Sequence, residues 1–173
     1  MSILIKSKPQ IDGIRKACQL AAKILDEIEP FVQAGVSTGE LDDRILQMHL
    51  DSGAIPAPLG YKGYPKCCCI SLNEVICHGI PDHKTILKEG DILNIDVSPI
   101  LGGYFGDSSR MYTVGQVSEE AARLIGTTKH CLDLGIKQVR VGNYFGNIGY
   151  AITVYAASHG YSIVHQFCGH GVG

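Results

Sequence analysis

Apolar residues recur at three- and four-residue steps between Ile11 and Ile28, which predicts an amphipathic helix over this stretch. The tetrapeptide Ser7–Gln10 has the form of a capping box before that helix, and Glu29-Pro30 marks its end. A second helix is predicted to begin at the capping box Ser37–Glu40 and to end at Ser52-Gly53. The start of the chain therefore predicts a pair of helices.

Residues 54–114 change character, because Gly and Pro separate short runs of residues that favour β-strands. The predicted strands of this region are Cys67–Leu72, Asp91–Ser98 and Tyr104–Val114. Helical periodicity returns from Glu119 to about Val139 and from Tyr144 to His159, and Tyr161–Phe167 is again predicted as a strand. Separate runs of helices and strands indicate an α+β fold.

The helical parts repeat when the chain is shifted along itself by 107 residues (139 − 32 = 107). Small and apolar positions of the first helix pair then coincide with like positions of the second without a gap. The matched pairs are Val32 with Val139, Gly35 with Gly142, Gly39 with Gly146, Leu41 with Ile148, Ile45 with Ile152, Met48 with Tyr155 and Gly53 with Gly160. A chance match in a chain with 21 glycines is the alternative. If the repeat is real, two copies need 2 × 107 = 214 residues, and the second is expected to be incomplete within 173.

The composition is that of a globular protein, with 45% hydrophobic and 18% charged residues among 173. It excludes intrinsic disorder, and the length suits one domain or at most two. The net charge of −2 gives no basic excess for nucleic acid or an anionic membrane. The longest apolar stretch, Ala151–Ala157, is too short to span a bilayer, and residues 1–28 lack the apolar region of a signal peptide. Because the seven cysteines are an odd number, we expect no disulfide framework. The expected location is therefore the reducing cytoplasm, in which the protein would be soluble.

The segment Asp91–Thr113 carries the most informative chemistry, because two strand-like runs flank Gly102-Gly103 and predict a β-hairpin. With a two-residue loop, paired positions sum to 205, so position 96 faces 109 and position 98 faces 107. Asp96 and Asp107 then share one face as diagonal neighbours, about 7–8 Å apart at the backbone. The opposite face of the first strand is predicted to pack on the core through Leu93, Ile95 and Val97. An odd-length loop or a bulge would place the two aspartates on opposite faces.

Two like charges side by side on a half-buried hairpin repel each other and are costly to desolvate. A shared proton, a paired cation or a bound metal would relieve that cost, and Asp96 and Asp107 alone do not decide between a metal and an ion pair with Arg110 or a nearby lysine. His170, which glycines flank, favours the metal, because two carboxylates and one imidazole suit Mn, Fe, Co or Zn. His78, in a turn bounded by Gly and Pro, is a candidate to contact substrate or to stabilise developing charge.

Three motifs, namely Asn73–Pro81, the hairpin with Asp96 and Asp107, and Gly169-His170-Gly171, together resemble the type I methionine aminopeptidases. The resemblance runs over the whole chain, and the three motifs in this order are more specific than any one of them. It implies a pita-bread fold, in which each of two pseudo-twofold halves backs helices onto a curved antiparallel sheet. The chain is then expected to be a single catalytic domain over residues 1–173, with a first half at about 1–115 and an incomplete second half from about 116.

The resemblance also implies roles for single residues. Asp96 and Asp107 correspond to the carboxylates that hold and bridge two divalent metal ions, and His170 corresponds to an imidazole ligand. His78 corresponds to the histidine that contacts the scissile peptide. The side chains that correspond to walls of the methionine pocket are Tyr61, Tyr64 and Cys69. A polarisable sulfur and aromatic edges suit a thioether.

Enzymes of this family remove the initiator methionine from new proteins whose second residue is small, by attack of a hydroxide held between two metal ions. The implied cofactors are two divalent ions from among Co, Mn, Fe, Zn and Ni, and the implied partners are nascent polypeptide N-termini. We expect a cytoplasmic protein, monomeric at full length, without a specific nucleic-acid or membrane partner. Association with the ribosome stays open.

The family pattern further requires a second histidine and two glutamates that would lie beyond Gly173, and by the repeat the counterpart of Asp96 would lie at 96 + 107 = 203. We therefore expect the chain as given to be C-terminally truncated and inactive by itself. Three alternatives stay open. They are a non-catalytic binding module on the same fold, a related Xaa-Pro peptidase, and a thiol hydrolase that uses Cys77 or Cys168 with a neighbouring histidine.

Overall fold

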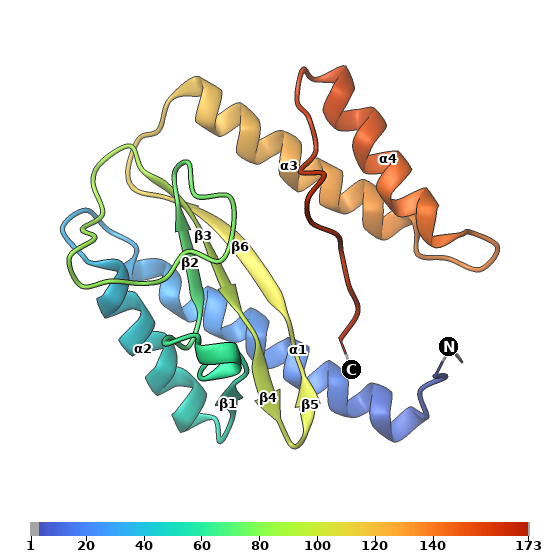
Figure 1. Ribbon diagram of the computed structural model, residues 1–173, viewed down its shortest axis with the longest axis horizontal. Helices are drawn as coiled ribbons and strands as arrows, with labels where there is room; N and C mark the ends of the chain where they lie inside the picture. The colour runs from blue at the N-terminus through green and yellow to red at the C-terminus, as the bar shows by residue number, and fades with distance from the viewer. Residues whose placement is uncertain (1–3, 173) are drawn as a thin grey trace. The chain divides into compact units, whose positions relative to one another are not determined.

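The computed structural model describes residues 4–172, and the chain divides into two compact units (Figure 1). The first unit comprises the chain up to Val117 together with the residues after His170, and the second is Ser118–His170. That the two units belong to one incomplete catalytic domain, divided near residue 115, stays a prediction. Among the described residues, no helix has both the length and the apolar character that crossing a membrane requires.

The first unit begins with the two predicted helices. Helix α1 spans Lys8–Ile28 behind Ser7, whose backbone N–H donates to the Gln10 side chain at 2.7 Å. A short 3-10 helix, η1, follows at Glu29–Phe31 and contains the proline that was expected to end α1. Helix α2 spans Thr38–Asp51. Because the capping residues satisfy backbone groups that a helix leaves unpaired, local sequence was sufficient to place both helices, and both predictions are confirmed.

Two three-stranded antiparallel sheets follow the helices, in the orders β1-β4-β5 and β2-β3-β6. The first sheet contains β1 (Ile55–Pro56), β4 (Pro99–Leu101) and β5 (Tyr104–Phe105). The second contains β2 (Cys69–Leu72), β3 (Ile92–Val97) and β6 (Ser108–Thr113). A second 3-10 helix, η2 (Tyr61–Gly63), lies between β1 and β2. The long hairpin predicted from the sequence is thus shared between the two sheets.

The predicted hairpin register is confirmed at both ends. Leu101 pairs with Tyr104 across the loop (101 + 104 = 205), and Asp96 pairs with Ser109 (96 + 109 = 205). The loop itself is Gly102-Gly103, with φ angles of 58° and 82°. A tight two-residue hairpin turn requires positive φ angles at both positions. Glycine adopts them without steric cost.

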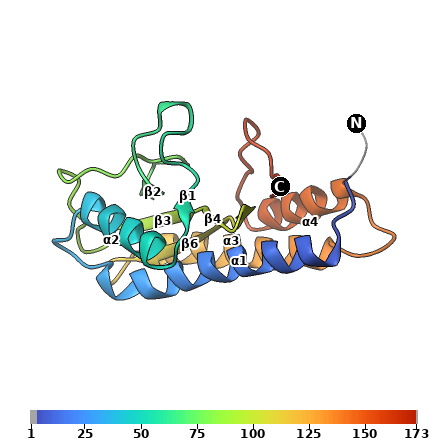
Figure 2. The same ribbon diagram turned by 90° about the horizontal axis from the view of Figure 1, so that it is seen from below.

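The core of this unit lies between the second sheet and the helices. In the side view, α1 runs below the strands, and α2 lies beside it at one end (Figure 2). The predicted core face of β3 is confirmed, because Leu93, Ile95 and Val97 are fully buried. The other fully buried large side chains of the core are Ile24, Ile28, Leu41, Ile45, Leu87 and Val114. The sheet therefore has one face on the core and leaves the face of Asp96 on the other side.

Gly106 allows the hairpin to lie directly on α1. A Cβ atom at this position would be 2.3 Å from the carbonyl oxygen of Ala17 and 2.8 Å from the backbone nitrogen of Cys18. Both neighbours are backbone atoms of α1, so they are not free to move aside as a flexible side chain would. The glycine thus holds the bend between the two sheets, next to Asp107, against the helix.

The second unit consists of α3 (Glu119–Gln138) and α4 (Phe145–Ser158), as predicted. Its backbone confirms the 107-residue repeat. The bounds of α2 shifted by 107 give 38 + 107 = 145 and 51 + 107 = 158, which are the bounds of α4. Val32 has φ −79° and ψ 84°, and Val139 has φ −77° and ψ 82°. Matching dihedrals in the connection exclude a chance match of glycines.

The predicted strand Tyr161–Phe167 is wrong, because the structure has no strand in this segment. In the first copy the corresponding strand, β1, pairs with Pro99 and Ile100 of β4. Their counterparts would be 99 + 107 = 206 and 100 + 107 = 207, which the 173 residues do not include. A strand depends on hydrogen bonds to a neighbour, so its β-favouring residues alone do not form one.

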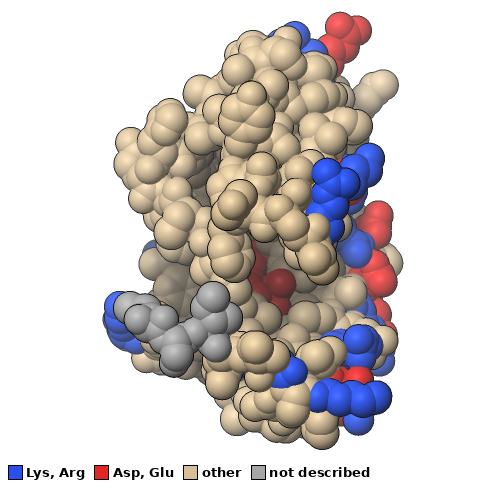
Figure 3. All heavy atoms as spheres, turned by 90° about the vertical axis from the view of Figure 1, so that its right-hand side faces the viewer, with Lys and Arg blue, Asp and Glu red and all other residues tan. Residues whose placement is uncertain are grey.

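The surface of the second unit is rich in uncharged side chains. No Lys, Arg, Asp or Glu occurs from Val141 to Gly173. Figure 3 shows one face of the molecule on which uncharged side chains predominate. The most exposed large apolar residues of the segment are Val141, Tyr144, Phe145 and Tyr150. Helix α4 and the loop before it therefore present apolar side chains to solvent.

Replacement of Gly106 by alanine tests the close contact with α1. We expect Gly106→Ala to lower the free energy of unfolding by about 1–3 kcal/mol, because the added methyl forces the backbone of the hairpin away from the helix. Urea denaturation followed by circular dichroism measures the change. Gly126→Ala is the control, since its Cβ would meet nothing within 4 Å on α3, and it is expected to stabilise by about 0.5–1 kcal/mol. Equal stability of Gly106→Ala and the wild type would contradict the role of Gly106.

His49 on α2 is expected to make the free energy of unfolding depend on pH. The side chain is fully buried, and its Nδ1 lies 2.8 Å from the carbonyl oxygen of Ile45, so Nδ1 carries the proton. Its Nε2 has no hydrogen-bond partner among residues 4–172. Burial lowers the pKa of His49 below its ordinary value of 6.5. The native state therefore holds a neutral imidazole that resists a second proton.

The free energy of unfolding should consequently fall as the pH drops below about 6.5, since the unfolded chain then binds a proton that the native state does not. This residue contributes a slope of at most about 1.4 kcal/mol per pH unit. His49→Leu is expected to lose that part of the slope, whereas the same change at exposed His165 should keep it. Urea titrations between about pH 5 and about pH 8, roughly 1.5 units on either side of 6.5, measure the difference. An unchanged slope in His49→Leu would exclude His49 as the group responsible.

Candidate metal and substrate site

Asp96 lies at the centre of the second sheet. It pairs with Cys69 of β2 on one side and with Ser109 of β6 on the other. Because side chains alternate along a strand, Asp96 points to the face opposite the buried Ile95 and Val97. Its carboxylate therefore stands on the half-buried outer face of the sheet.

Asp107 lies at the bend between the two sheets, directly before β6. The hydroxyl of Ser98 donates to Oδ1 of Asp107 at 3.4 Å, which agrees with the predicted pairing of these two positions (98 + 107 = 205). Continued register on both sides of the bend leaves Asp107 on the same face as Asp96. The two carboxylates thus share a face, as the two-residue loop requires.

The thiol of Cys69 is influenced by several other residues of the candidate site. Burial raises the pKa of this thiol above the ordinary value, and the nearby charges of Asp96, Cys77 and Asp107 raise this pKa further. A hydrogen bond with Tyr64 acts in the opposite direction. Both aspartates therefore lie close enough to Cys69 to influence its ionisation, and the thiol stays protonated near neutral pH.

Tyr64 connects this strand to a neighbouring loop. Its hydroxyl lies 3.0 Å from the carbonyl oxygen of Cys68 and 3.1 Å from that of Gly79, and it donates to them. Burial raises the pKa of Tyr64 above its ordinary value. The phenol is therefore a neutral donor that holds the ring at the side of Cys69.

The loop that contains His78 is held against β2. The N–H of Ile70 donates to the carbonyl oxygen of Gly79 at 2.9 Å, and the N–H of Gly79 donates to the hydroxyl of Ser71 at 3.2 Å. A Cβ at Gly79 would lie 2.2 Å from the carbonyl oxygen of Ile70, so only glycine fits there. The preceding His78 is exposed and has a φ of 55°, which is uncommon for a residue other than glycine. The loop thus fixes the backbone of His78 next to the strand of Cys69.

Arg110 does not neutralise the aspartate pair. It is paired with the buried Ile95 in the ladder and so belongs to the other face of the sheet. There its guanidinium lies 2.7 Å from a carboxylate oxygen of Asp26 and 3.8 Å from one of Glu29. The ion pair with Arg110 that the sequence left open is therefore wrong.

The two other predicted site residues are placed differently. Tyr61 belongs to η2 and is 65% exposed, with the ammonium of Lys62 5.4 Å from its ring centroid. Its place in a pocket wall stays a prediction. His170 belongs to the second unit, and its approach to Asp96 and Asp107 likewise stays a prediction.

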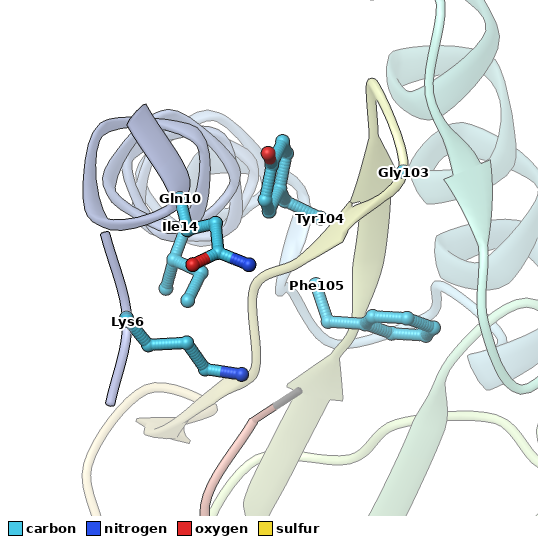
Figure 4. A pocket seen from close by; sticks show the side chains of 6 residues that line it. All are labelled: Lys6, Gln10, Ile14, Gly103, Tyr104 and Phe105. Atoms are coloured by element: carbon cyan, nitrogen blue, oxygen red, sulfur yellow. The ribbon is translucent and has the colours of Figure 1, made fainter. Parts of the chain in front are cut away.

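Cys77, which the sequence named only as a nucleophile of the alternative thiol hydrolase, lies close enough to Cys69 to raise the pKa of that thiol. Its place directly before His78 in the loop is the signal that identifies it. The cavity in Figure 4, of about 180 Å³, is elsewhere, between the start of α1 and the β4–β5 hairpin. It is lined by Lys6, Gln10, Ile14, Gly103, Tyr104 and Phe105, which include no predicted site residue.

The residues of this face fit a metal centre. Two carboxylates on one sheet face supply hard oxygen donors for divalent cations, and the candidate arginine counter-ion lies on the other face. A helix-backed antiparallel sheet that carries such a pair agrees with the pita-bread metallopeptidase class that the sequence resembles. Comparison with known proteins agrees, because the profile of "Metallopeptidase family M24" matches residues 12–173. The chain belongs to this family.

Its similar relatives include methionine aminopeptidases. The chain is 48% identical over 171 residues to "Methionine aminopeptidase A" of Synechocystis, covering 99% of this chain and 68% of that protein. It is 49% identical over 175 aligned positions to "Methionine aminopeptidase" of Salmonella typhimurium, covering 100% of this chain and 66% of that protein. The chain thus spans about two thirds of the length of the curated relatives it matches.

Solved structures confirm the expected pita-bread fold. The crystal structure of methionine aminopeptidase from Rickettsia prowazekii aligns with a TM-score of 0.97 and 47% identity, over 99% of this chain and 68% of that one. An Xaa-Pro dipeptidase from Bacillus anthracis aligns with a TM-score of 0.83 and 20% identity, over 98% of this chain and 46% of that one. The second likeness is one of fold alone.

The environment of Cys69 is testable by alkylation. Reaction of the thiol with iodoacetamide, followed by mass spectrometry of the Cys69 peptide, should show an inflection above the ordinary thiol pKa of 9.0. Tyr64→Phe removes the hydrogen bond that lowers this pKa, so the inflection should move higher. Asp107→Asn removes a neighbouring negative charge and should move it lower. Shifts in the reverse directions would show that these side chains do not surround Cys69 as described.

Proposed function

We propose that this chain contributes to a metalloaminopeptidase that removes N-terminal methionine from polypeptides whose second residue is small. The observation that carries the proposal is the gathering of Asp96, Asp107 and Cys69 on one face of the β2-β3-β6 sheet. The identity of 48% to a protein named methionine aminopeptidase A supports the choice of substrate.

In this proposal Asp96, Asp107 and His170 hold two divalent metal ions. Bound divalent cations supply Lewis-acid polarisation of a peptide carbonyl and a water of lowered pKa, which is the chemistry of amide hydrolysis. The protein's own part is to fix the carboxylates. The ladder holds the backbone of Asp96 on both sides, and Ser98 orients the carboxylate of Asp107 by a hydrogen bond of 3.4 Å.

The side chain of the substrate methionine would lie against Cys69 and Tyr64, with Tyr61 as a further wall. The raised pKa of Cys69 keeps the thiol uncharged, and a neutral thiol next to an aromatic edge favours a thioether over a charged side chain. His78, exposed at the end of the loop that Gly79 anchors, would contact the peptide group to be cleaved.

Nascent polypeptide N-termini are the substrates that this chemistry serves. Within residues 1–173 the candidate ligands are two aspartates and one histidine, whereas the family pattern adds a second histidine and two glutamates. We therefore propose that the chain as given does not turn over substrate by itself.

A chimaera tests the proposal on this chain's own residues. Residues 1–173 would be joined to the C-terminal third of the Synechocystis methionine aminopeptidase A, which supplies the remaining length. We expect release of methionine from a Met-Ala-Ser peptide with Mn²⁺ or Co²⁺ added. Asp107→Ala should reduce kcat/KM at least about 100-fold, because it removes a proposed metal ligand. Asp43→Ala, at an exposed carboxylate of α2, is the matched control.

Two outcomes would overturn the proposal. A folded chimaera that cleaves Xaa-Pro peptides and leaves Met-Ala-Ser intact would assign the other peptidase class. A folded chimaera that neither cleaves a peptide nor binds Mn²⁺ in calorimetry would favour the non-catalytic alternative. Separately, turnover by the 173-residue chain alone that Asp107→Ala abolishes would contradict its proposed inactivity.

A further inference from the structure

A second group of metal-binding side chains lies inside the first unit, away from the two aspartates of the hairpin. It consists of Asp42 on α2 and the adjacent Cys67 and Cys68. The ligand atoms of all three lie within 4.8 Å of one another. The three residues are 4%, 1% and 0% exposed, so the group lies in the interior of the unit and is not a chance gathering of surface side chains.

The two thiols converge although their residues are consecutive. In a strand, consecutive side chains would point to opposite faces, which argues against a shared site. Strand β2, however, begins only at Cys69, and residues 66–68 form a bend. Sγ of Cys67 lies 3.0 Å and Sγ of Cys68 lies 3.5 Å from Oδ1 of Asp42. The bend therefore turns both sulfurs toward one carboxylate.

The carboxylate of Asp42 is held in place by its surroundings. The backbone N–H groups of Cys67 and Cys68 donate to Oδ1 at 2.9 and 3.3 Å. Nζ of Lys66 lies 3.2 Å from Oδ2. These contacts hold the carboxylate of Asp42 in a fixed position beside the two sulfurs, which reduces the rearrangement that metal binding would require.

We propose that Asp42, Cys67 and Cys68 form a binding site for one thiophilic divalent cation, of the kind represented by Zn²⁺ or Cd²⁺. A set of two thiolates and one carboxylate binds such ions in preference to Mg²⁺ or Ca²⁺. Binding replaces the two thiol protons, which leave to solvent, with one doubly charged cation. The net charge of the buried group is therefore the same before and after binding.

The geometry suits such an ion. With Zn–S near 2.3 Å and Zn–O near 2.0–2.2 Å, the edges of a tetrahedral site measure roughly 3.5–3.8 Å. The observed Sγ–Oδ1 separation of 3.5 Å for Cys68 matches these edges. The separation of 3.0 Å for Cys67 is shorter, so its sulfur would move outward by about half an ångström on binding. The three protein ligands leave a fourth position for water. Lys66, whose side chain is 22% exposed, is the partner of the group that reaches toward solvent.

The site is close to the proposed substrate site but chemically different from it. Cys68 directly precedes Cys69, and its carbonyl oxygen accepts the hydrogen bond of Tyr64. Occupation would therefore be transmitted to the wall of the proposed methionine pocket, a consequence that rests on the proposed function. The aspartate pair of the hairpin, in contrast, offers carboxylate oxygens. Thiolate coordination thus distinguishes the two sites without an activity assay.

Titration of the 173-residue chain with Cd²⁺ tests the proposal. We expect an ultraviolet thiolate-to-cadmium charge-transfer band that saturates at one ion per chain. Cys67→Ser and Cys68→Ser keep a hydroxyl to donate to Asp42, and each should weaken the Cd²⁺ affinity at least about 100-fold, because loss of a ligand exceeds the effect of losing an outer partner. Cys131→Ser, at a buried thiol of α3, is the matched control and should bind as the wild type does.

Loss of the band in Cys69→Ser, with the band retained in Cys67→Ser and Cys68→Ser, would overturn the proposal and assign the thiolates to the face of the hairpin. A folded wild type without a band would also overturn it. Should the serine variants not fold, labelling of the wild type decides. Cd²⁺ must then slow iodoacetamide modification of Cys67 and Cys68 relative to Cys131, and equal rates would refute the site.

Discussion

The two-residue loop at Gly102-Gly103 fixes the register of the hairpin. The register in turn determines the face of the sheet to which each side chain of β3 and β6 points. A slip by one residue would exchange the two faces of the sheet. It would turn Asp96 into the core and expose three apolar side chains, each of which gains about 1.5–3 kcal/mol from burial. These side chains are Leu93, Ile95 and Val97. The same alternation that builds the core therefore holds the carboxylates on the outer face.

The hairpin is also bent, and the bend lies beside Asp107. Both strands pass from one sheet to the other at this level without a change of register. Gly106 permits the bend, because any larger residue would collide with the backbone of α1 at Ala17. The close contact of Gly106 with α1 thus also sets the position of Asp107. The stability of the fold and the geometry of the candidate site therefore depend on this one contact.

The features that the sequence predicted are those that local chemistry determines. Capping residues and apolar periodicity placed the helices, and a diglycine between two alternating runs placed the hairpin. Contacts between distant segments were not predictable in this way. Cys67 meets Asp42, 25 positions earlier, only because a bend interrupts the strand pattern. The effect of Cys77 on Cys69 likewise depends on how Gly79 anchors its loop.

The twofold repeat separates what a helix pair does by itself from what a sheet adds. Both copies form two helices joined by the same connection, so the helices themselves do not require the sheet. In the first copy Leu41 and Ile45 are fully buried within a core that includes the sheet, whereas their counterparts Ile148 and Ile152 are only half-buried. Gly135 lets α3 approach those isoleucines, with its Cβ position 3.1 Å from Ile152, but contact between two helices covers one side of each. The sheet therefore completes the burial of the helix pair, and its outer face, freed from the core, is where the candidate chemistry lies.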